Sequence, residues 1–148
     1  MKETKNGVNI GSDFPLNRID ENLSWKIRSF EDQGKRFYVI VRYFCVPKIF
    51  ALYVTLADVP KIAEKYLAYM SINDDVDPER RMTMTTNVIS IEKLPNVEKT
   101  ILDNADCWRI SMFVLKSFLK TETKEDLGET ITVGASVKIM NKPEAERY

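Results

Sequence analysis

Alternation of apolar and polar side chains is the feature that most restricts what this chain can fold into. It is clearest in residues 129–139, where every second position is apolar: Ile131, Val133, Ala135, Val137 and Ile139. Successive side chains of a β-strand point to opposite faces, so this pattern predicts a strand with one buried face and one solvent-facing side.

The same period of two recurs along the chain and predicts further half-buried strands. These predicted strands cover residues 23–27, 37–45, 50–56, 66–72 and 82–91. Residues 31–34 form a turn-like break after the first of them, and Pro60 closes the third. In the last strand the alternation slips near Asn87, as a β-bulge would cause.

Two segments have spacings that suit helices, residues 97–104 and 108–120. In the second, the apolar residues fit spacings of three and four as well as strand alternation, so both structures stay open. Short strands without a linker-like segment predict one domain, an antiparallel β-sandwich of the mainly all-β class with one or two short helices. We expect this domain at 7–140, between a disordered tail at 1–6 and a C-terminal tail at 141–148.

Charge and hydropathy restrict the partners. The 22 basic and 22 acidic residues cancel, so nucleic acid is not an expected partner. Membrane insertion is not expected, because no apolar run approaches the roughly 20 residues that span a bilayer. Residues 1–9 are polar and do not resemble a secretory signal. We therefore expect an intracellular protein, cytoplasmic or nuclear.

The chain contains no histidine, which removes the commonest general base and the commonest metal ligand. An acidic cluster could hold calcium, but it lacks the mid-loop glycine and the closing glutamate of that motif, so a solvated turn is the stronger interpretation. The cluster consists of Asp74, Asp75, Asp77 and Glu79. We predict no enzymatic activity, no cofactor and no metal; catalysis by carboxylates alone stays open, although no pair stands out.

Two further groups of residues have ordinary structural interpretations. Cys45 and Cys107 lie in apolar runs, which favours two thiols without a disulfide, although one bridge stays open if their strands are neighbours. Basic residues next to aromatic ones resemble a nucleic-acid surface, but with zero net charge they fit strand faces better. This group consists of Lys35, Arg36 and Arg42 beside Tyr38 and Phe44.

From Trp108 the chain reads W-R-I-S-M-F-V-L-K-S-F-L, with apolar residues at Phe113, Val114 and Phe118. These spacings resemble the late block of MATH domains, the meprin and TRAF homology family. Residues 53–72 are similar to its central strand, Pro-Lys loop and next strand, and residues 7–14 with 24–28 match more weakly. The likeness is nearest to MATH domains joined to BTB domains.

Two departures accompany this resemblance. The family's first strand has no counterpart before Gly7, and residues 37–50 are longer than the usual hairpin. The first strand is therefore either divergent, displaced or missing.

The resemblance implies a non-enzymatic protein-protein interaction module, an eight-stranded sandwich that binds a short extended peptide. In MATH-BTB proteins such a module recruits substrates to a ubiquitin ligase. Tyr53 and Trp108 match groove positions of the family in type, although a buried core position is an equal alternative for both. Ala68 and Ile110 stand where relatives carry phenylalanine, so binding of the same peptide is not assumed.

The alternative function is a self-associating structural β-sandwich without a peptide groove. A mass that rises with concentration would favour it, whereas a monomer with an aromatic groove would favour peptide capture. A carboxylate-based enzyme ranks below both and requires a deep pocket with two acids. The oligomeric state is not predicted.

Overall fold

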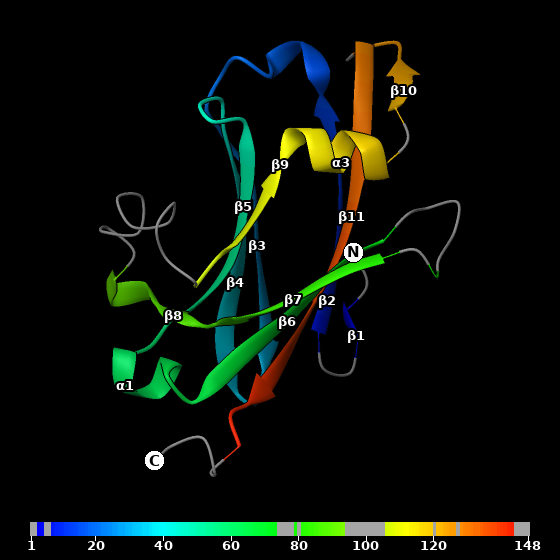
Figure 1. Ribbon diagram of the computed structural model, residues 1–148. Helices are drawn as coiled ribbons and strands as arrows, with labels where there is room; N and C mark the ends of the chain where they lie inside the picture. The colour runs from blue at the N-terminus through cyan, green and yellow to red at the C-terminus, as the bar shows by residue number, and fades with distance from the viewer. Residues whose placement is uncertain are drawn as a thin grey trace.

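Two β-sheets face each other in the computed structural model, which describes residues 3–4, 7–73, 79, 81–93, 106–119, 121–126 and 128–143 (Figure 1). The first sheet has the order β1 (Glu3–Thr4), β2 (Gly7–Pro15), β11 (Gly128–Asn141), β6 (Tyr66–Asn73) and β7 (Arg81–Asn87); β10 (Thr121–Lys124) also pairs with β11. The second has the order β3 (Leu23–Asp32), β4 (Lys35–Phe44), β5 (Ile49–Leu56) and β8 (Ile89–Ser90); β9 (Trp108–Ser111) also pairs with β5. The predicted all-β sandwich is confirmed.

The strand predicted from residues 129–139 forms the centre of the first sheet. β11 pairs antiparallel with β2 and with β6, and its register places Val137 opposite both Val8 and Met70. Its five alternating apolar residues are all buried in the main core. The period of two therefore reports one buried strand face, as expected.

Side chains from the inner faces of both sheets form this main core. It includes an aromatic cluster in which the ring of Phe14 lies 4.9 Å from those of Tyr43 and Phe50, measured between ring centroids. The Tyr43 hydroxyl donates a hydrogen bond of 2.7 Å to the carbonyl oxygen of Ile19, which satisfies its polar end. Burial of these large rings, together with the aliphatic side chains of the core, stabilises the packing of the two sheets.

The α-helices of the described residues are short, α1 (Pro60–Ala63) and α3 (Met112–Phe118). The 3₁₀ turns η1 (Leu16–Arg18) and η2 (Ile91–Lys93) complete the elements. Residues 108–120, which fitted both periods, divide between the two structures, because β9 ends at Ser111 and α3 begins at the next residue. The helix predicted at 97–104 lies outside the described residues.

The prediction of one strand at residues 82–91 is wrong, and a bulge, one explanation for the slip near Asn87, is not its cause. β7 ends at Asn87, Val88 is buried, and β8 then joins the opposite sheet, where it pairs parallel with β5. Ile91 begins η2 rather than ending a strand. The slip in alternation thus marks the point at which the chain crosses from one sheet to the other.

The strand boundaries also differ slightly from expectation. The turn predicted at 31–34 is shorter, because β3 continues to Asp32 and β4 begins at Lys35. Gln33 and Gly34 form the turn with φ angles of 54° and 73°. β1 lies within the expected N-terminal tail and pairs with β2, and β11 continues to Asn141. The long hairpin noted at 37–50 is formed by β4 and β5, which pair from Phe37–Leu56 to Phe44–Ile49.

Candidate functional site

Tyr53 lies on the outer face of the second sheet. It is directly opposite Ile40 and belongs to a small cluster with Ala51, Ile89 and Cys107, separate from the main core. Its side chain is 0% exposed, and Nε of Arg42 donates a hydrogen bond of 2.9 Å to its hydroxyl. The tyrosine body is therefore buried while its polar end is satisfied.

Trp108 lies on the inner face of the same sheet. It is opposite Leu52, belongs to the main core and is 8% exposed. The two residues predicted to line a peptide groove thus sit on opposite faces of one sheet and are not brought together. Ala68 and Ile110, at the other two groove positions, are also in the main core. The expected role of Tyr53 and Trp108 in peptide binding stays a prediction.

The basic and aromatic residues of β4 are used within the fold. Tyr38 and Phe44 pack against the cluster around Tyr53, and Arg36 forms an ion pair with Glu31. Nζ of Lys35 lies 3.0 Å from a carboxylate oxygen of Asp58. Hydrogen bonding by Lys35 lowers the pKa of Asp58, and the same contact raises the pKa of Lys35.

The edge of the first sheet offers a different candidate. The strand order ends at β7, so among the described residues no strand pairs with its other side. Its inward residues are Met82, Met84 and Thr86, which lie opposite the buried inward residues of β6. An open edge presents backbone donors and acceptors that another extended chain can use.

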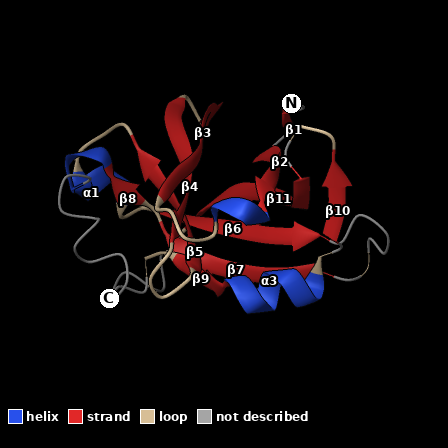
Figure 2. Ribbon diagram, turned by 90° about the horizontal axis from the view of Figure 1, so that it is seen from above, coloured by secondary structure: helices blue, strands red, loops and turns tan. Residues whose placement is uncertain are grey.

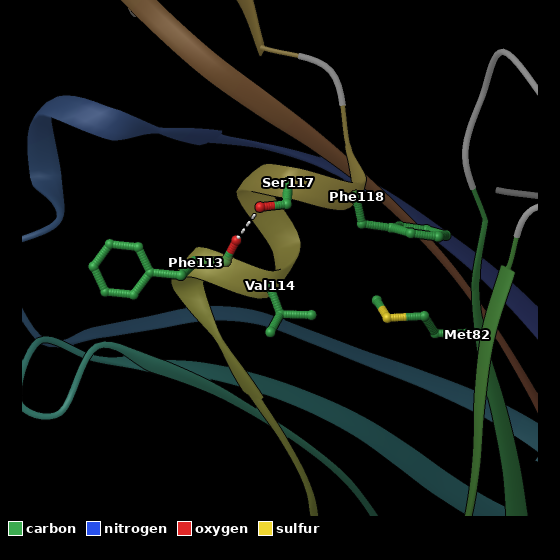
Figure 3. A pocket seen from close by; sticks show the side chains of 5 residues that line it. All are labelled: Met82, Phe113, Val114, Ser117 and Phe118. Atoms are coloured by element: carbon green, nitrogen blue, oxygen red, sulfur yellow. Dashed lines mark hydrogen bonds between the residues drawn. The ribbon is translucent and has the colours of Figure 1, made fainter.

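An apolar groove separates this edge from α3. Its walls are Met82 from β7 and four residues of α3, namely Phe113, Val114, Ser117 and Phe118, and its volume is about 410 Å³. Met82 extends toward α3, where Val114 and Phe118 point toward it, whereas the ring of Phe113 points the other way (Figure 3). We call these five residues the edge groove.

Exposed apolar side chains lie in and next to the edge groove. Phe113 is 72% exposed, Val114 is 48% exposed and Met84, the next inward residue of β7, is 39% exposed. Seen from above, α3 overlaps the line of β7 (Figure 2), whereas in the front view the helix lies higher than β7 (Figure 1). Met82 of β7 and α3 border the groove between them. Large apolar side chains that remain exposed together often mark an interaction site.

A second hollow, of about 210 Å³, lies between α1, η2 and the crossing from β7 to β8. Its charged side chains are balanced: Glu64 and Asp106 against Lys93 and Lys142. Asn87 donates a hydrogen bond of 2.7 Å to Asp106. This polar hollow therefore shows no preference for one sign of ligand charge.

The structure also bears on the chemistry considered from the sequence. Cys45 and Cys107 form no disulfide, and burial raises the pKa of the Cys107 thiol to about 11. Among the described residues, no three cysteine, aspartate or glutamate side chains are grouped so that they could hold a metal ion. Asp74, Asp75 and Asp77 lie outside that part, whereas Glu79 is described.

The edge groove was missed in the sequence, although a signal was present. Met112 and Leu115 are three residues apart and therefore share one face of a helix. When that face is buried, Phe113 and Val114, which lie between them, point away from the core and remain exposed, as observed. Reading this segment as a helix with a second apolar face would have located the groove wall.

The fold and the groove define the chain as a mainly β sandwich with an apolar edge groove. Neither known protein-family models nor curated proteins give a match to the chain. None of the described helices has both the length and the apolar character needed to cross a membrane.

Proposed function

We propose that this chain is a MATH-like, non-enzymatic module that captures a short extended segment of another protein along β7. The observation that carries this proposal is the open side of β7 running next to the edge groove. A segment added as a strand forms backbone hydrogen bonds with the edge, and every second side chain points to one face. The groove would accept one such apolar side chain.

The three sequence blocks that resemble MATH domains support peptide capture, although the groove positions that they imply are Tyr53 and Trp108 rather than β7. In the proposed adaptor role, a ubiquitin ligase supplied by other domains would act on the captured protein. Such a role implies an intracellular protein. The absence of histidine agrees with binding rather than catalysis.

A peptide selection with matched variants tests this proposal. Wild-type protein is used to select binders from a displayed library of random peptides, and the affinity of a chosen peptide is measured by fluorescence anisotropy. Val114→Glu, which places a charge in the edge groove, should raise the Kd about tenfold or more, equivalent to about 1.4 kcal/mol. Circular dichroism verifies that the variant is folded.

Val46→Glu is the matched control, because Val46 is also exposed but does not line the edge groove. Its affinity should equal that of the wild type. Failure to select any peptide, or a selected peptide that binds Val114→Glu as tightly as the wild type, would contradict the proposal.

A further inference from the structure

Within the part of the chain that the structure describes, β7 is an edge strand whose own sequence shows few of the usual protections. Exposed edges are commonly blunted by proline, bulges, central charges or very short strands. β7 has seven residues, its register with β6 runs unbroken from Arg81 to Asn87, and its one charge is at the first position. An edge of this kind favours pairing with another strand.

The strand is complementary to itself. If two copies of β7 pair antiparallel about a two-fold axis at Met84, Arg81 faces Asn87, Met82 faces Thr86, Thr83 faces Thr85 and Met84 faces its own counterpart. Directly opposite residues share a face, so Met82, Met84 and Thr86 remain inward and Thr83 pairs with Thr85 on the outward face. No like charges are opposed.

The exposed side chains around β7 are apolar and therefore suit contact with the same surface of a second copy. Met84 is partly exposed, and Phe113 and Val114 project from the neighbouring helix. A two-fold axis at Met84 would join the inward methionines of both copies into one apolar stripe between the two edge grooves. The chain has zero net charge, so no general repulsion opposes the approach of two copies.

We infer that the partner of this edge in the absence of peptide is a second copy of the chain, paired antiparallel through β7 about Met84. The inference goes beyond peptide capture and does not require it. Both events use the same side of β7, so dimer and peptide exclude each other, and peptide binding releases monomers.

Sedimentation equilibrium with charge-swapped variants tests the inference. The wild-type mass should rise from one chain toward two between about 1 µM and about 1 mM. Met84→Glu and Met84→Lys each place like charges opposite one another at the axis, so each variant alone should stay monomeric. An equimolar mixture of the two should regain the dimer, because Glu then faces Lys.

Val46→Glu serves as the control and should dimerise like the wild type, and circular dichroism verifies that every variant is folded. Three results would each overturn the inference: a wild type that stays monomeric, a Met84→Glu variant that dimerises normally, or a mixture that stays monomeric. A wild type that stays monomeric but still binds a selected peptide would contradict the dimer without contradicting the proposed function.

Discussion

Tyr53 and Trp108 occupy two different interiors. Trp108 contributes to the core between the sheets, whereas Tyr53 lies in the smaller cluster on the outer face of β5. Trp108 lies on β9 opposite Leu52 of β5, and Tyr53 is the next residue of β5. Because successive residues of a strand point to opposite faces, Trp108 and Tyr53 lie on opposite sides of the sheet. A core side chain that is only 8% exposed has little surface left for a partner, so Trp108 is expected to act through stability.

Trp108→Ala should lower the free energy of unfolding by about 3–5 kcal/mol, because it removes a large core side chain and leaves a cavity. Urea denaturation followed by circular dichroism measures this loss. Arg109→Ala is the control, since the neighbouring Arg109 is exposed, and its effect should stay within about 0.5 kcal/mol. A stable Trp108→Ala variant that has lost peptide affinity would restore the groove role predicted from the sequence.

Cys107 makes stability depend on pH in the alkaline range. Burial raises the pKa of its thiol from 9.0 to about 11, so the folded state keeps a proton that the unfolded state loses. The associated stability is fully present below about pH 9 and is lost as pH rises toward 11. The free energy of unfolding, measured in urea at a series of pH values, should fall more steeply in this window for wild type than for Cys107→Ala.

Cys45→Ala is the matched control, because Cys45 is only partly buried. Its pH profile should follow that of the wild type. Equal slopes for wild type and Cys107→Ala would show that the buried thiol does not contribute to the alkaline decline.

At the scale of elements, the stability of α3 depends on its contacts with the rest of the fold. Its seven residues are too few for a helix that is stable alone. Met112 and Leu115 are buried in the main core, and the backbone nitrogen of Met112 donates a hydrogen bond of 2.9 Å to the carbonyl oxygen of Lys48. These contacts hold the helix beside β7 and so form one wall of the edge groove.

Ser111→Ala should destabilise the protein by about 1 kcal/mol, because the Ser111 hydroxyl caps α3 by accepting a hydrogen bond of 3.1 Å from the Phe113 backbone nitrogen. Ser111→Asp should retain most of the stability, since aspartate also caps helices. Urea midpoints measure both effects.

Ser117→Ala is the control within the same helix. The Ser117 hydroxyl donates a hydrogen bond of 2.9 Å to the carbonyl oxygen of Phe113 at an exposed position, a contact that adds little to helix stability. If Ser111→Ala and Ser117→Ala have the same midpoint, the cap is not what holds α3.

The segment that contains β7 and β8 shows why element boundaries were harder to predict than element types. Both strands carry β-like sequence, and only Val88, which is buried, separates them. In the sequence this reads as one strand with a slip. The chain instead changes sheets, since one continuous strand could not face both partners.

For the molecule as a whole, the proposed peptide and the proposed second copy use the same edge of the first sheet. Peptide capture and dimer formation both add a strand to β7 and both bury apolar surface next to α3. Ligand binding to the monomer therefore opposes self-association by mass action. The concentration of the chain itself would then set how much of the edge is open to a partner.

The sequence by itself determined the fold class and most strands, because alternation is a local property that records one buried and one exposed face. Residues 129–139 are the clearest case. The tertiary structure decided which buried face each aromatic residue occupies and which sheet β8 joins. It also created the edge groove by placing Val114 and Phe118 of α3 opposite Met82. These outcomes depend on contacts between residues far apart in the chain. The local pattern records that α3 has apolar residues outside its buried face, but not which strand they lie opposite.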